Sequence, residues 1–70
     1  MASYYRLNLN QQSNGDHEVH KQGCSFYPTQ NYDSLGSFEY CFQAVAEAKR
    51  KYPFKKINGC YFCANACHTS

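Results

Sequence analysis

Residues 40–53, YCFQAVAEAKRKYP, contain the clearest secondary-structure signal of the chain. Apolar side chains recur there at i, i+3, i+4, i+7 and i+11, which places on one helix face the residues Cys41, Ala44, Val45, Ala48 and Tyr52. On the opposite face Glu47 and Lys51 have the spacing of an i,i+4 ion pair. Basic residues fill the last turn, and Pro53 ends the helix because it lacks a backbone N–H. The segment predicts one amphipathic helix, and Cys41 on its apolar face is expected to be buried and unreactive.

The segments before the helix have the two-residue period of β-strands. In residues 4–10 the side chains of Tyr5, Leu7 and Leu9 alternate with polar ones. Residues 11–16 contain the turn signal Asn14-Gly15, and residues 17–21 continue as a second strand, so the two strands predict a hairpin. Residues 35–38 predict a third strand, in which a glycine at position 36 indicates a bulge or a close approach of another backbone segment.

Residues 55–63 predict a last strand after the helix. Its apolar residues are Ile57, Tyr61 and Phe62, and Asn58-Gly59 indicates a bulge or a turn. Strands, one helix and a further strand predict a single α+β domain over residues 1–70. We expect a small antiparallel sheet, made of a hairpin plus one or two further strands, with the helix packed on one face.

The composition narrows the class of protein. Seven Lys/Arg against five Asp/Glu give a net charge of +2, which alone does not indicate nucleic acid. Seven Tyr and five Phe predict an aromatic core and suit an interface between subunits. The chain shows no signal-peptide pattern and no apolar run long enough to span a membrane, and its five cysteines fit poorly with a secreted disulfide framework. We therefore expect a cytoplasmic protein in which thiols or metal ligands are favoured over disulfides.

The C-terminal pattern Cys60-x2-Cys63-x3-Cys67-His68 is typical of metal ligands. Thiolates two or three residues apart can reach one tetrahedral ion. We expect Cys60, Cys63 and Cys67 to bind a structural zinc ion, with Cys24 or His68 as the fourth ligand. Two alternatives remain: some of these cysteines are small buried apolar residues, or Cys60 and Cys63 form a thiol redox pair.

The segment His17-Glu18-Val19-His20 also contains potential ligands. In a strand, His17 and His20 point to opposite faces and cannot bind the same metal ion. We therefore expect an exposed strand with two solvated imidazoles. A catalytic Cys–His pair is disfavoured because seventy residues rarely build a cleft, an oxyanion hole and an orienting group together.

A basic cluster lies around the end of the predicted helix. Five of the seven positive charges fall within eight positions, with one tyrosine among them, and the set is Lys49, Arg50, Lys51, Tyr52, Lys55 and Lys56. Cations with interleaved aromatic rings suit an anionic, nucleotide-like ligand or single-stranded nucleic acid. The alternative is that helix C-termini attract basic residues in any case. No established nucleic-acid-binding motif accompanies the cluster, which weakens the nucleic-acid interpretation.

Four strings occur in the order HEVHKQGC, LGSF, AVAEAK and GCYFCANACHTS. In these strings the sequence resembles a group of small bacterial and phage proteins, and the resemblance spans most of the chain. The resemblance implies a hairpin-plus-helix fold and a bacterial or phage cytoplasmic setting. It transfers no catalytic residues.

The sequence contains no phosphate-binding loop, catalytic triad motif or motif of paired carboxylates. We therefore expect a non-catalytic, homo-oligomeric binding protein that occupies a partner protein or captures a small anionic or nucleotide-like ligand. The phage setting extends this expectation to an anti-defence protein. The alternatives are a zinc-stabilised structural or interaction module and a thiol redox protein.

Overall fold

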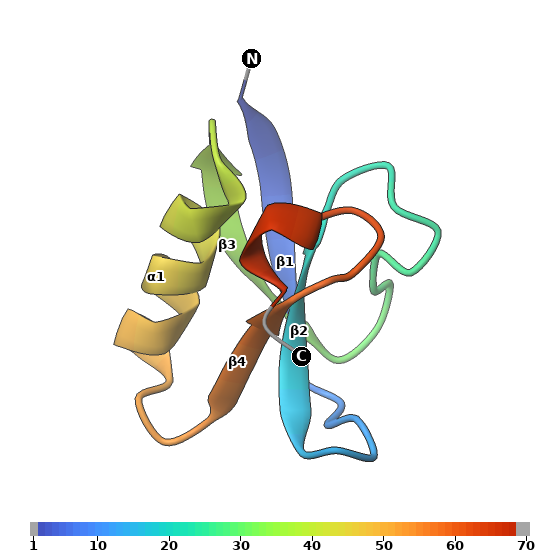
Figure 1. The fold of residues 1–70 in the computed structure, drawn as a ribbon, viewed down its shortest axis with the longest axis vertical. Helices are drawn as coiled ribbons and strands as arrows, with labels where there is room; N and C mark the ends of the chain where they lie inside the picture. Colours follow the sequence, from blue (N-terminus) through green and yellow to red (C-terminus); the bar gives the residue numbers. More distant parts are fainter. Residues whose placement is uncertain (1, 69–70) are drawn as a thin grey trace.

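The computed structural model describes residues 2–68, and within them a four-stranded sheet carries one α-helix (Figure 1). Strands β1 (Ser3–Asn8) and β2 (Asp16–Lys21) form the expected hairpin, and β3 (Tyr32–Phe38) pairs with the other edge of β1. Helix α1 (Cys41–Lys51) follows, and then β4 (Lys56–Gly59) and the short 3-10 helix η1 (Asn65–Cys67). The predicted α+β fold class is confirmed.

The strand order is β3-β1-β2-β4, and the sheet is mixed. Strand β1 is antiparallel to both of its neighbours, whereas β4 runs parallel to β2, with His17 opposite Ile57 and Val19 opposite Gly59. Parallel pairing requires a long crossover, which β3 and α1 supply here. Because the two strands run the same way, the segments that follow β2 and β4 emerge at the same end of the sheet.

The core lies between the sheet and α1. Its buried residues are Tyr5, Leu7, Val19, Leu35, Ala44 and Ala48. The two alanines are completely buried, and their small side chains allow the helix to pack closely on the strands. The two-residue period and the helical period in the sequence therefore both identified core residues correctly.

Two details of β3 and α1 explain how these elements are held. Tyr5 pairs with Gly36 and Arg6 with Ser34, so Leu35 is the extra residue of the predicted bulge. At the start of α1 the side-chain oxygen of Gln43 accepts the backbone N–H groups of Glu39 and Tyr40, at 3.1 and 3.0 Å. This contact replaces the conventional N-cap that the sequence lacks.

The expected ion pair on the helix is replaced by two others. Glu47 pairs with Arg50 at 2.7 Å, and Lys51 instead reaches Asp33 on β3 at 2.7 Å. Tyr52 donates a hydrogen bond of 2.7 Å to the same carboxylate. The end of α1 is thereby attached to an edge strand, which an analysis restricted to the helix does not reveal.

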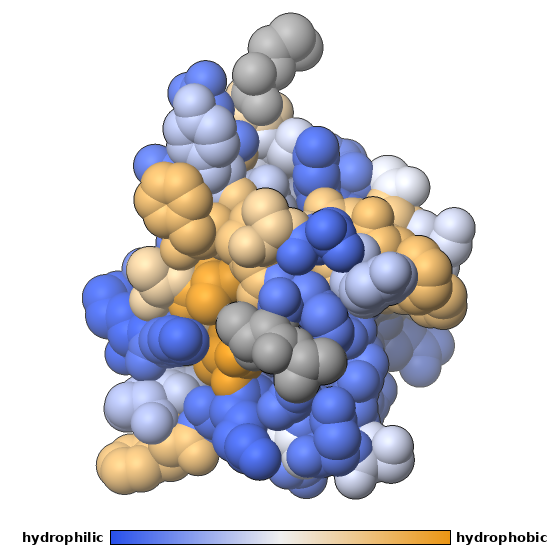
Figure 2. All heavy atoms as spheres, viewed as in Figure 1, coloured by the Kyte–Doolittle hydropathy of each residue, from blue (hydrophilic) through white to orange (hydrophobic). Residues whose placement is uncertain are grey.

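The last strand is shorter than expected. It ends at Gly59, and Tyr61 and Phe62 lie in the turn that follows, 57% and 72% exposed. The prediction that they are strand residues was wrong, because the backbone turns directly after β4 instead of continuing the ladder. The space-filling view shows hydrophobic side chains gathered across the middle and upper part of one face, above a hydrophilic region (Figure 2). No helix within residues 2–68 has the length and apolar character needed to cross a membrane.

Candidate metal centre

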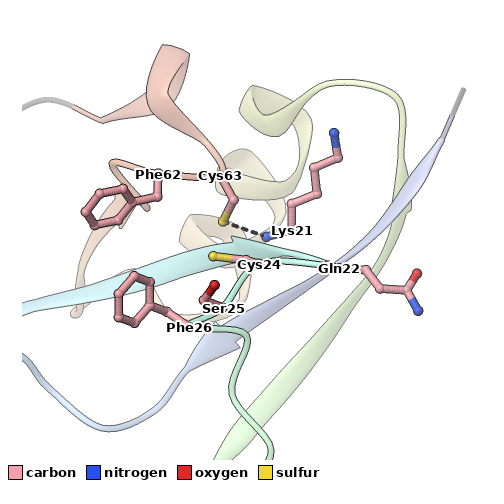
Figure 3. A pocket seen from close by; sticks show the side chains of 8 residues that line it. Lys21, Gln22, Cys24, Ser25, Phe26, Phe62 and Cys63 are labelled. Carbon is pink, nitrogen blue, oxygen red and sulfur yellow. Dashed lines mark hydrogen bonds between the residues drawn. The ribbon is translucent and has the colours of Figure 1, made fainter.

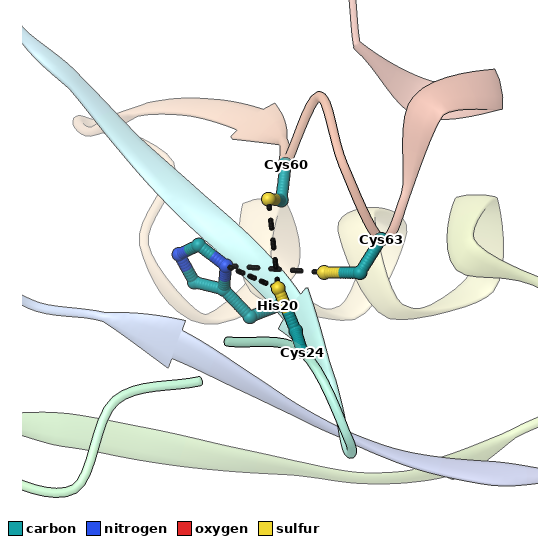
Figure 4. Close-up of side chains that lie close together, drawn as sticks. All are labelled: His20, Cys24, Cys60 and Cys63. Atoms are coloured by element: carbon teal, nitrogen blue, oxygen red, sulfur yellow. Dashed lines mark hydrogen bonds between the residues drawn. The ribbon is translucent and has the colours of Figure 1, made fainter. Parts of the chain in front are cut away.

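Four side chains converge where β2 and β4 end (Figure 4). His20 lies near the end of β2 and Cys24 in the turn after it, while Cys60 directly follows β4 and Cys63 comes three residues later. The imidazole nitrogen and the three sulfur atoms all lie within 4.8 Å of one another. The parallel pairing of β2 with β4 brings these two distant parts of the chain together.

The spacing of the four atoms fits a tetrahedral ion. His20 Nδ1 lies 3.9 Å from both Cys24 Sγ and Cys63 Sγ, and the sulfurs of Cys24 and Cys60 are also 3.9 Å apart. With Zn–S bonds of about 2.3 Å, neighbouring sulfurs of a tetrahedral site are about 3.8 Å apart. A zinc ion therefore fits between these atoms with little movement of the chain.

Tight turns hold the sulfur-bearing residues in place. The N–H of Cys24 bonds to the carbonyl of Lys21 at 3.1 Å, across Gly23 in its left-handed conformation (φ +96°). The N–H of Ala64 bonds back to the carbonyl of Cys60 at 2.9 Å. The N–H of Lys21 donates to Cys63 Sγ at 3.3 Å, a contact that stabilises a thiolate.

Burial shifts the pKa of two members of the cluster, His20 and Cys63. Burial lowers the pKa of His20, which favours the neutral imidazole that metal ions bind. Burial, followed by the hydrogen bond to Cys24, raises the pKa of the Cys63 thiol far above its usual range. A metal ion would displace that proton.

The structure brings together three of the five predicted metal ligands. Cys24, Cys60 and Cys63 lie in the cluster as free thiols. Cys67 does not, because its sulfur is bonded to Cys41 in a disulfide with a Cα–Cα distance of 6.3 Å. The disulfide contradicts the expectation that Cys67 is a metal ligand, and for this pair it replaces the expected thiols. Cys41, which we expected to be buried and unreactive, is half-buried and forms this bond. The turn before η1 directs Cys67 toward the helix rather than toward Cys63.

His68 also lies outside the cluster. Its Nδ1 is 3.0 Å from the carbonyl oxygen of Gly59, and its ring meets that of Tyr61 edge-on. The imidazole therefore supports the turn after β4. Its position next to a cysteine in the sequence suggested a ligand, but the short 3-10 helix turns it back onto the strand end.

His20 is the candidate ligand that the sequence analysis considered and then set aside. We expected two solvated imidazoles, yet His17 is 5% and His20 2% exposed. Strand β2 is central in the sheet, and both of its faces are covered. The predicted divergence of the two rings is confirmed: His17 Nδ1 is 3.1 Å from the carbonyl of Asn8, whereas His20 faces the sulfurs. The spacing of His20 and Cys24, four residues apart around a turn glycine, was the available signal.

A hollow of about 700 Å³ opens beside the cluster (Figure 3). Its wall includes Cys24 and Cys63, together with Phe26 and Phe62, whose rings lie 5.3 Å apart. Tyr61 meets Phe62 edge-on at 5.3 Å. All three rings are more than half exposed. The two turns that carry the candidate metal ligands therefore also carry an exposed aromatic surface.

The predicted basic cluster is divided by the fold. Arg50, Lys51 and Tyr52 are engaged with Glu47 or Asp33, as described above. The other three members line a separate hollow of about 470 Å³ and are Lys49, Lys55 and Lys56. Half of the predicted ligand-binding set thus surrounds a common space, and the other half stabilises the helix end.

A scan against protein-family models and searches of curated proteins and solved structures find no match for the chain. One histidine and three cysteines could hold a metal ion. Four protein ligands complete a tetrahedral shell and leave no position for a substrate, which is typical of structural rather than catalytic metal sites.

Proposed function

We propose that the protein is a zinc-stabilised interaction module. In this proposal one zinc ion is bound by His20, Cys24, Cys60 and Cys63, and the turns around it contact a partner. The observation that carries the proposal is the approach of the four ligand atoms to within 4.8 Å of one another. Zinc accepts a mixed set of thiolates and imidazole in tetrahedral geometry, whereas Mg²⁺ and Ca²⁺ require oxygen ligands.

A structural ion is consistent with the size of the domain. A chain of 70 residues buries little apolar surface and commonly needs a metal ion or a disulfide for stability. The proposed ion cross-links residues 20–24 to residues 60–63, beside a disulfide that already joins α1 to η1. The binding free energy of the ion then contributes directly to the stability of the fold.

The interaction surface in this proposal is the aromatic group Phe26, Tyr61 and Phe62. Each of these residues follows a candidate ligand by one or two positions. Exposed aromatic side chains held on a rigid base lose little conformational entropy when they bind. The ion would fix the base and the three rings would make the contact. The module would be non-catalytic, as we expect from the sequence. The disulfide between Cys41 and Cys67 is at odds with the reducing cytoplasm that the sequence led us to expect.

Native mass spectrometry of the untagged protein tests the proposal directly. We expect an increment of one zinc ion per chain, lost after treatment with a strong chelator together with a fall in the melting temperature. Cys24→Ser should abolish zinc retention. The matched control is the double variant Cys41→Ser/Cys67→Ser, which removes two sulfurs outside the cluster and should retain the ion. A metal-free protein that melts identically with and without chelator would overturn the proposal.

A second candidate function is capture of a small anionic ligand. It is favoured by the hollow that Lys49, Lys55 and Lys56 line together with a single carboxylate, that of Asp16. A nucleotide-like ligand there would fit the anti-defence role that the phage resemblance suggests. Isothermal titration with inorganic phosphate and with a cyclic dinucleotide tests this candidate. Lys55→Gln should weaken any binding severalfold. Lys21→Gln should not, because Lys21 lies at the end of β2 and the hollow lies at its beginning, at Asp16. If neither probe produces heat, this candidate function is refuted.

A further inference from the structure

Glu18 lies on β2 two residues before His20, on the same face of the strand. Its carboxylate oxygen Oε1 is 3.4 Å from His20 Nε2. The imidazole side chain is 2% exposed and the carboxylate side chain only 14% exposed. The contact is thus shielded from water, and the carboxyl group of Glu18 lies against the buried ring of His20.

The two nitrogens of the ring have different surroundings. Nδ1 faces the sulfurs of Cys24 and Cys63, at 3.9 Å from each, whereas Nε2 faces Glu18. A neutral imidazole has one N–H and one lone pair, and the partner of the N–H decides which nitrogen can bind a metal ion. Nδ1 is therefore placed to bind a metal ion, and Nε2 is placed to bond to the carboxylate of Glu18.

We propose that Glu18 is a positioning residue for the metal centre. It accepts the Nε2–H of His20, and so directs the Nδ1 lone pair at the ion. The inference rests on the proposed zinc site and assigns to it a residue outside the set of four ligands. Carboxylates that hold a ligating histidine through its second nitrogen orient the ring and increase its basicity.

The opposite tautomer is disfavoured at both ends of the ring. With the proton on Nδ1, an N–H would point into the group of sulfurs and occupy the place of the ion. Nε2 would then present a lone pair to the carboxylate, and two acceptors would face each other without a proton between them. Glu18 therefore selects the tautomer that can bind metal before the ion arrives.

The surroundings of Glu18 hold its side chain toward the ring. It shares the wall of a small hollow of about 140 Å³ with Gln12, Cys60 and Tyr61. Burial, the larger effect, raises the pKa of the carboxylate, whereas Gln12 acts to lower it. The carboxylate thus has Gln12 of the hairpin turn and the ring of His20 as neighbours.

The test uses the full-length, zinc-loaded protein and the variants Glu18→Ala and Glu18→Gln. Zinc affinity is measured by competition with a chromophoric chelator, and the tautomer of His20 by long-range ¹H–¹⁵N correlation of the ring. We expect Glu18→Ala to weaken zinc binding by about tenfold to a hundredfold. Glu18→Gln should recover part of the loss, because its amide oxygen can still accept the Nε2–H. Glu39→Gln, which removes a carboxylate far from the cluster, is the matched control.

The outcomes separate this inference from the proposed function. If the wild-type protein binds no zinc, the metal site itself fails. If it binds zinc but His20 carries its proton on Nδ1, or Glu18→Ala binds within twofold of the wild type, the site stands and the role of Glu18 is refuted. If Glu18→Ala fails to fold, the role of Glu18 is tested with the ring spectrum and the zinc affinity of Glu18→Gln. An Nε2–H signal shifted from that of the wild type supports the hydrogen bond. An unchanged signal contradicts it.

Discussion

Cys67 Cβ lies 2.7 Å from the point where a β-carbon on Gly59 would stand. The carbonyl oxygen of Ala64 is 2.9 Å from the same point. These atoms belong to the backbone and to a disulfide-bonded side chain, so they have little freedom to move. The end of β4 therefore packs directly against η1, immediately before Cys60.

We expect Gly59→Ala to lower the free energy of unfolding by about 2 kcal/mol, since an inserted methyl group overpacks a closed contact. Because Cys60 follows directly, zinc retention should fall as well. Urea unfolding and native mass spectrometry measure the two effects. Gly15→Ala is the comparison: it carries backbone strain at φ +92° but meets only flexible side chains, those of Gln11 at 3.6 Å and Lys56 at 3.8 Å. Equal losses in both variants would contradict the close contact.

Removal of the disulfide should destabilise the fold without emptying the metal site. Cys41 and Cys67 are separated by 26 positions, and a loop of that length corresponds to roughly 3 kcal/mol of unfolded-chain entropy. We expect Cys41→Ala/Cys67→Ala to lose about that much in urea unfolding at unchanged zinc stoichiometry. A wild-type protein whose stability is insensitive to a mild reductant would argue against the bond.

Asp33 should give the protein a distinct pH dependence. Hydrogen bonds from Lys51 and Tyr52 hold the pKa of this carboxyl below its ordinary value. The folded state therefore binds fewer protons than the unfolded state, so the contribution is present above about pH 4 and is lost as the pH falls through the folded pKa.

Asp33→Asn should accordingly reduce stability at pH 7 by about 1 kcal/mol, a value limited by partial solvent exposure. The difference in stability between the variant and the wild type should disappear below pH 3. Thermal melts across the pH range measure it, with Glu39→Gln as a carboxylate control. A difference that stays constant with pH would show that the charge of Asp33 is not the cause.

Arg6 on β1 holds the long connection between β2 and β3 against the sheet. Its guanidinium lies over the rings of Tyr27 and Tyr32, at 4.5 and 3.9 Å, and donates to the carbonyl of Pro28 at 2.9 Å. We expect Arg6→Lys to lose roughly 1 kcal/mol, because an ammonium group cannot stack and bond in the same way. Hydrogen exchange should accelerate in residues 25–31, and unchanged protection there would refute this role.

The regular elements could be predicted from the sequence because their signals are local. The alternation of Tyr5 and Leu7 and the spacing of Ala44 and Ala48 each follow from the period of one element. The length of the last strand could not be predicted in this way. Tyr61 and Phe62 have strand-like side chains, but their conformation is set by the turn after Gly59.

The candidate metal centre could be predicted only in part. The spacing of Cys60 and Cys63 reveals a chelating pair without knowledge of the fold. Cys67 has an equally suggestive spacing, and its bond to Cys41 depends on how η1 meets the helix. The place of His20 depends on the parallel pairing of β2 with β4, which no local pattern encodes.

The parallel pairing of β2 with β4 also has a consequence for biosynthesis. His20 and Cys24 leave the ribosome about forty residues before Cys60 and Cys63, and they can hold no complete coordination shell until β4 has added to the sheet. Zinc in the proposed site would therefore be captured only by a chain whose sheet is already assembled. Loading of the ion would serve as a final proofreading step, leaving incompletely folded chains without it.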